Sequence, residues 1–175
     1  MGVGAAVEAA TGGNAGVVGL SAMLGTGGMS THCLTQSAGE AQRVSVSGLL
    51  SLIAASPTAS VIFRRYTQAF INQLAQSVAC NRLHTIDQRC ARWLLMTHDR
   101  IGGGDDFDLT QEFLSYMLGV RREGVSVAST ALQKLGLIRY RRGHLSVLTR
   151  PRSDERRYGK EGRARWSPAT LQKTR

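Results

Sequence analysis

The most constraining feature of the sequence is a pair of short amphipathic segments that meet at a glycine between Leu109 and Leu137. In the first segment, Thr110 can cap a helix by accepting a free backbone N–H. The apolar positions that follow have helical spacing: Phe113, Leu114, Met117 and Leu118. Gly119 tolerates the left-handed backbone of a tight turn, and Val120 can fill the angle beyond it. The pattern therefore predicts two short helices that cross steeply.

The second of these helices is predicted to begin near Arg121 and to have one apolar and one polar face. Four positions at spacings of three or four are expected to face inward: Val125, Ala128, Leu132 and Leu135. The opposite face is expected to carry Arg122, Glu123, Ser126 and Ser129. Arginine can bind guanine through a two-pronged hydrogen bond, and glutamate can accept one from cytosine. This face is suited to the major groove of duplex DNA.

A second basic feature follows directly, because Leu137–Leu148 contains two β-prone runs around an Arg-Gly-His turn. The hairpin predicts a wing whose arginines contact DNA phosphates: Arg139, Arg141, Arg142 and Arg150. Residues 1–138 carry 10 basic and 9 acidic side chains, whereas residues 139–175 carry 12 basic and 3 acidic ones. The excess positive charge is therefore local to the wing and to the tail beyond it, which is consistent with nucleic-acid binding.

Upstream, the sequence predicts a long helix over Pro57 to Asn81, with proline in its first turn. An apolar stripe runs along it: Phe63, Tyr66, Phe70, Leu74 and Val78. The length of the stripe favours pairing with the same helix of a second subunit. Packing on the helix's own domain is the alternative.

A further helix is predicted from Thr85, because Thr85-Ile86-Asp87-Gln88 is a capping box. Its buried face is expected to hold Ile86, Cys90, Trp93, Leu94 and Thr97. The acidic, glycine-rich segment Asp99–Asp108 is expected to be an exposed loop.

The two ends of the chain differ from this central part in composition. Residues 1–55 are rich in glycine and small residues, and β-prone pieces occur at Val17–Leu20, Cys33–Gln36 and Gln42–Val46. We expect a few strands of an incomplete domain there. Residues 151–175 have low hydrophobicity and 8 basic against 3 acidic residues, so we expect a disordered basic tail.

The composition also argues against several functions. The cysteines Cys33, Cys80 and Cys90 form no CxxC pair, and the four histidines are scattered, so neither a metal site nor a catalytic set is indicated. We therefore expect no enzyme activity, no metal and no cofactor. Without a long apolar run or a signal peptide, we expect a cytoplasmic protein with no membrane partner.

From about Gly12 to Arg150 the chain resembles the Crp/Fnr family of bacterial transcription regulators, most clearly in LTQEFLSYMLGVRRE and in RYTQAFINQLAQSVACNRLHTIDQRCARWLLMTHDR. The resemblance implies an α+β fold with three parts and a tail. These are a truncated β-roll over 1–55, a dimerisation helix over 56–82, a winged helix-turn-helix over 83–150, and the basic tail over 151–175.

The resemblance also implies roles for single residues. Arg122 and Glu123 would read bases, while Thr110, Gln111 and Arg121 would hold phosphates. Val127 stands where such regulators have a third base-reading arginine, and Gly124 replaces a typical threonine or serine. The segment Gly16–Gln36 is similar to a cyclic-nucleotide cassette, but Leu20 replaces the ribose-binding glutamate and no arginine occurs near Ser30 and Thr31. We therefore expect no bound cyclic nucleotide.

Together these features predict a DNA-binding transcription regulator that acts as a homodimer on a roughly palindromic site. The resemblance adds RNA polymerase as a further partner. One alternative is an interaction protein that dimerises with an intact relative and interferes with it. Two weaker ones are a winged helix that binds only protein and nonspecific nucleic-acid binding by the tail.

Overall fold

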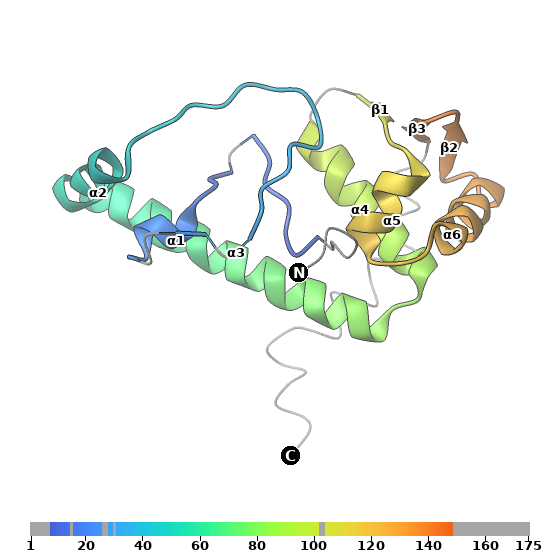
Figure 1. The fold of residues 1–175 in the computed structure, drawn as a ribbon, viewed down its shortest axis with the longest axis horizontal. Helices are drawn as coiled ribbons and strands as arrows, with labels where there is room; N and C mark the ends of the chain where they lie inside the picture. The colour runs from blue at the N-terminus through green and yellow to red at the C-terminus, as the bar shows by residue number, and fades with distance from the viewer. Residues whose placement is uncertain (1–7, 15, 26–27, 30, 102–103, 149–175) are drawn as a thin grey trace, which may run out of the picture. The chain divides into compact units, whose positions relative to one another are not determined.

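The computed structural model describes residues 8–14, 16–25, 28–29, 31–101 and 104–148. The helices and strands of this part are α1 (Leu20–Met23), α2 (Val46–Ala55), α3 (Pro57–Leu83), α4 (Ile86–Ile101), β1 (Asp106–Asp108), α5 (Gln111–Leu118), α6 (Arg122–Lys134), β2 (Ile138–Arg141) and β3 (His144–Val147) (Figure 1). Contacts divide the chain into two units. The helical unit is Gly12–Val78, and the winged unit joins the segment up to Thr11 to the residues from Ala79 onward.

The helical unit corrects the expectation of strands near the N-terminus. Among its described residues none forms a strand: the β-prone pieces 17–20, 33–36 and 42–46 are coil or lead into helices α1 and α2. An isolated strand is unstable without neighbours that complete its hydrogen bonds and cover its apolar face. The partial β-roll expected for residues 1–55 is therefore not formed by the described residues.

The long helix predicted from Pro57 is confirmed as α3, which has Pro57 as its first residue. The side chain of Ser56 accepts a hydrogen bond from the amide of Ala59 at 3.2 Å, which satisfies one of the free N–H groups of the first turn. No single described helix is long and apolar enough to cross a membrane. The consecutive helices α2 and α3 pass such a test only as a pair, and they are bent by 117°.

The apolar stripe on α3 is only partly covered within its own unit. Phe63, Tyr66, Phe70 and Leu74 are half-buried, whereas Val78 is 71% exposed. The rings of Tyr66 and Phe70 stack with centroids 6.5 Å apart, and the Tyr66 hydroxyl accepts a hydrogen bond from the Val17 amide at 2.9 Å. Tyr66 therefore also holds the chain near Val17.

The core of the winged unit lies where α4, α5, α6 and the sheet meet (Figure 1). The largest fully buried apolar side chains come from each of these elements: Leu94, Leu114, Val125, Leu132 and Leu145. The predicted buried face of α4 is confirmed for Cys90, Trp93, Leu94 and Thr97, while Ile86 is 36% exposed. Gln88 accepts a hydrogen bond from the Thr85 amide at 3.0 Å, as the capping box predicts.

The sheet is antiparallel with the order β1-β3-β2, and it corrects the expectation of a loop over Asp99–Asp108. Helix α4 continues to Ile101, and Asp106–Asp108 form β1, in which Phe107 lies opposite Leu145. Acidic side chains at Asp106 and Asp108 face away from the core on either side of Phe107, so the strand has the ordinary alternation of an edge. The mixture of helices with a small antiparallel sheet confirms the α+β class.

Leu145 within β3 and Leu148 just after it test where the core ends. Leu145 is fully buried and Leu148 is 45% exposed, although both lie in the same stretch of chain. We expect Leu145→Ala to lower the free energy of unfolding by about 2–5 kcal/mol, and Leu148→Ala to change it by less than about 0.5 kcal/mol. Urea titrations of both variants measure this, and equal losses would contradict the described core.

Candidate nucleic-acid interface

The turn between α5 and α6 is built from local sequence signals at both ends of α5. The Thr110 side chain accepts a hydrogen bond from the Phe113 amide at 3.1 Å, which confirms the predicted cap. Gly119 has φ 62° and ψ 40°, a left-handed conformation that strains any residue with a Cβ. The Gly119 amide donates to Tyr116 at 3.2 Å and the Val120 amide to Ser115 at 3.1 Å, the pair of bonds that defines a Schellman motif.

A second contact fixes the end of α5 from outside the helix. The guanidinium of Arg89, on α4, donates to the carbonyl of Leu118. Because the last carbonyls of a helix lack partners within it, this bond satisfies one of them and joins α4 to the turn. Sequence reasoning made no prediction for Arg89, since a lone arginine on a helix has no distinguishing pattern.

The faces of α6 agree with the sequence prediction at most positions. Val125, Ala128 and Leu132 are buried, and Arg122, Glu123 and Ser126 are exposed. Two predicted positions are wrong: Ser129 is only 2% exposed, and Leu135 is 39% exposed. Ser129 lies four residues after Val125 and so belongs to the inward stripe, whereas Leu135 is the cap residue that follows the end of α6.

Gly124 lies where α6 comes close to the start of α4. A Cβ at this position would lie 3.4 Å from Cδ1 of Ile86, which is ordinary van der Waals contact. Steric space therefore does not require glycine at position 124.

The wing is the predicted hairpin. Arg142 and Gly143 both have positive φ, 47° and 89°, as in the two-residue turns that match the twist of a hairpin. Ile138, Leu145 and Val147 are buried beneath it. Arg139, Arg141 and Arg142 are exposed on the outside. Arg150 and the tail 151–175 lie outside the described residues.

The acidic strand β1, which sequence reasoning missed, lies on the other side of β3 from the arginines of β2. The carboxylate of Asp108 on β1 lies 2.5 Å from Nδ1 of His144 on β3, and His144 is paired in turn with Arg141 on β2. Side chains directly opposite on one face of an antiparallel sheet are neighbours. A row of acid, histidine and arginine therefore crosses the outer face of the sheet.

Tyr140 connects the wing to the start of α5 and to the last turn of α6. Its hydroxyl donates to the carbonyl of Leu109 at 2.7 Å, and its amide donates to the side chain of Gln133 at 3.1 Å. Burial raises the pKa of Tyr140, and the positive charge of Arg122 and a hydrogen bond with the backbone of Gln111 oppose this rise. The two hydrogen bonds hold Tyr140 between Leu109 and Gln133.

The structure thus brings the predicted DNA-contacting residues into one unit on three elements. Gln111 is half-buried, and the others are exposed: Thr110, Arg121, Arg122, Glu123, Ser126, Arg139, Arg141 and Arg142. In the described part of the chain no three His, Cys, Asp or Glu side chains are grouped as a metal site would require.

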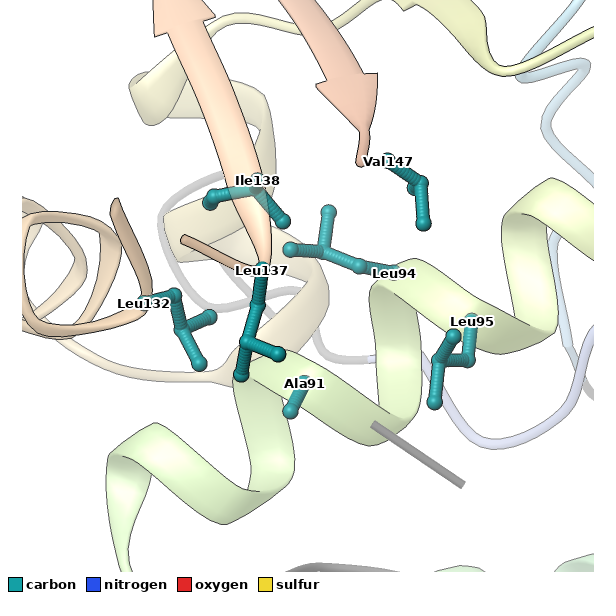
Figure 2. Close-up of a pocket in the computed structure, with 7 residues that line it drawn as sticks. All are labelled: Ala91, Leu94, Leu95, Leu132, Leu137, Ile138 and Val147. Atoms are coloured by element: carbon teal, nitrogen blue, oxygen red, sulfur yellow. The ribbon is translucent and has the colours of Figure 1, made fainter. Parts of the chain in front are cut away.

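A hollow in the winged unit is entirely apolar (Figure 2). Its lining comes from α4, α6, β2, β3 and the residue before β2: Ala91, Leu94, Leu95, Leu132, Leu137, Ile138 and Val147. A small-molecule site usually adds a few polar groups that orient the ligand. This hollow has none and is part of the core.

The comparison with protein families decides what this unit is. Residues 88–152 match the model of the Crp-like helix-turn-helix domain. The matched residues run from the first turn of α4 through the wing. Over these residues the winged unit is similar to the Crp-like helix-turn-helix domain. The match confirms the resemblance to the Crp/Fnr family that the sequence motifs indicated. A comparison with curated protein sequences gives no significant match.

Solved structures are similar to part of this chain at low identity, and the first two of those that follow support a shared fold. FixK2 from Bradyrhizobium japonicum is 18% identical, with 63% of this chain and 57% of that chain covered and a TM-score of 0.56. A CooA mutant from Carboxydothermus hydrogenoformans is 17% identical, with 63% and 54% covered and a TM-score of 0.50. A transcriptional regulator of the CRP family from Thermus thermophilus is 19% identical, with 57% and 53% covered and a TM-score of 0.48. The chain matches only about half the length of these structures.

The cysteines give a chemical test of the packing around the Crp-like domain. Burial and, less strongly, the nearby Asp87 carboxylate raise the pKa of Cys90 from 9.0 to about 12, whereas Cys33 is exposed. We expect a thiol reagent at pH 8 to label Cys33 rapidly and Cys90 only after unfolding. Because the folded state favours the neutral thiol, Cys90 should make folding less favourable as pH rises from about 9 towards 12. Mass mapping that found Cys90 labelled as fast as Cys33 would contradict this packing.

Proposed function

We propose that the protein is a DNA-binding transcription regulator that inserts the start of α6 into the major groove. The observation that carries this proposal is the position of Arg122 and Glu123. Both are exposed on the first turn of α6, while Val125, one turn further in, is fully buried. Burial on one side of the helix fixes which side chains point outward.

Base recognition in this proposal depends on Arg122 and Glu123. The guanidinium of Arg122 can donate to O6 and N7 of guanine, and the carboxylate of Glu123 can accept from N4 of cytosine. Val127 follows Glu123 by one turn on the same side of α6 and is 67% exposed. The resemblance implies an arginine at this position. The methyl groups of Val127 suit the methyl group of thymine instead, so the base pair that faces Val127 should differ from the one that such an arginine would read.

The remaining predicted residues are assigned to the phosphates. Arg121 precedes α6, and Thr110 and Gln111 stand at the start of α5. The wing adds Arg139, Arg141 and Arg142. Contacts of this kind give affinity and orientation without reading sequence. By resemblance, RNA polymerase is a further partner of the DNA-bound protein.

Substitution of Arg122 and of Arg141 distinguishes base reading from phosphate binding. We expect Arg122→Ala to weaken binding to the preferred duplex by about 1–3 kcal/mol and to leave binding to random DNA nearly unchanged. Arg141→Ala should weaken both alike and reduce the slope of log affinity against log salt by about 1. Fluorescence anisotropy over a salt series measures both. An equal loss on both duplexes for Arg122→Ala would contradict base readout.

We also propose that α3 pairs two copies of the chain, which would place two recognition helices about 34 Å apart on a roughly palindromic site. Ile71 and Val78 are 51% and 71% exposed, and Leu74 lies between them, so the stripe has an uncovered edge. The half-buried Phe63, Tyr66 and Phe70 continue it toward the start of the helix.

Charge on the stripe should break this dimer. Val61 is 39% exposed and lies at least about 100° around the helix from every residue of the stripe. Val78→Glu should therefore elute as a monomer, and Val61→Glu, which makes the same substitution, as a dimer. Size-exclusion chromatography with light scattering distinguishes them. A wild-type monomer, or two variants that behave alike, would contradict pairing through this stripe.

The same uncovered edge favours one alternative function, in which the chain pairs with an intact relative and interferes with it. Mixed dimers would form through the same residues, so Val78→Glu should abolish them too. Co-purification of tagged chain with such a relative tests this alternative, and it fails if only dimers of identical chains are recovered.

A further inference from the structure

A short segment far from the helix-turn-helix in sequence is bound on the winged unit. The indole of Trp93 on α4 is 5% exposed, and its N–H donates to the Glu8 carboxylate at 2.9 Å. The same indole makes an edge contact with Phe113 of α5, with ring centroids 6.4 Å apart. An indole N–H can only donate, so this buried donor needs an acceptor, and Glu8 supplies it.

Two further hydrogen bonds hold the same segment. The Glu8 amide donates to the carbonyl of Met117 in the last turn of α5, at 3.2 Å. Arg100 on α4 donates through Nε to the carbonyl of Thr11 at 3.1 Å and through Nη1 to the carbonyl of Met96 at 2.9 Å. The bond to Met96 fixes the guanidinium against its own helix.

The segment contacts two separate turns of α4. Trp93 and Arg100 are seven residues apart, which corresponds to about 10 Å along a helix. Within the segment, the Thr11 hydroxyl donates to the other carboxylate oxygen of Glu8. This bond orients the Glu8 carboxylate that accepts from Trp93.

We propose that Trp93, Arg100 and the Met117 carbonyl form a docking surface for a short acidic peptide segment, and that residues Glu8–Thr11 of the same chain are its occupant. The surface offers two N–H donors and one carbonyl acceptor. The segment offers the Glu8 carboxylate to Trp93, the Thr11 carbonyl to Arg100 and the Glu8 N–H to the Met117 carbonyl. A partner that captured this segment would remove a contact from the end of α5, two residues before Gly119.

The experiment uses the full chain without DNA, in a Trp166→Phe background, so that Trp93 gives the single indole N–H signal in a ¹⁵N NMR spectrum. Glu8→Ala should shift this signal and speed its exchange with water. Glu8→Gln should keep the signal near its original position, because the amide oxygen can accept the same bond. Glu40→Ala, which removes an exposed carboxylate, is the matched control and should change nothing.

Two outcomes overturn the proposal. An unchanged Trp93 signal in Glu8→Ala, with the fold intact by circular dichroism, shows that the segment does not occupy the surface. A signal that changes on dilution shows that the segment comes from a second copy and not from the same chain. Neither outcome depends on the proposed DNA binding.

Discussion

The winged unit depends on the burial of one face of α6 against α4, α5 and the sheet. Val125, Ala128 and Leu132 are almost fully removed from solvent, and each of the larger aliphatic side chains contributes roughly 1.5–3 kcal/mol. Rotation of α6 about its axis would expose these side chains. The same burial that stabilises the domain therefore also determines that Arg122 and Glu123 point outward.

The direction of α6 is set at its start by the end of α5. Gly119 adopts the left-handed conformation, the amides of Gly119 and Val120 close the Schellman motif, and Arg89 binds the carbonyl of Leu118. These contacts are made by backbone groups and by a residue of α4, so the turn is held by the scaffold and not by the side chains that are proposed to contact DNA. Recognition residues on a rigid element lose little further freedom when they bind.

The helix-turn-helix and the wing could be predicted because their signals are local. Thr110 caps α5, Gly119 ends it, and the Arg142–Gly143 turn lies between two alternating strands. The prediction that Ser129 is exposed is wrong, because sequence alone does not distinguish a buried small polar residue from an exposed one.

The missed features depend on partners distant in sequence. The three residues of β1 resemble a polar loop, because only pairing with β3 makes Asp106–Asp108 a strand. The described residues form no strand near Val17 or Gln42, because β-prone residues form a sheet only when neighbouring strands complete it. The contact of Glu8 with Trp93 spans 85 residues and has no sequence signal at all.

The central claim is that the exposed start of α6 reads DNA sequence. Selection of bound duplexes from a random pool by the full chain tests it most directly. We expect a shared sequence with two-fold symmetry, whose half-sites are centred about 10 base pairs apart. Recovery of duplexes with no common sequence, at an ionic strength where binding persists, would contradict base reading by α6.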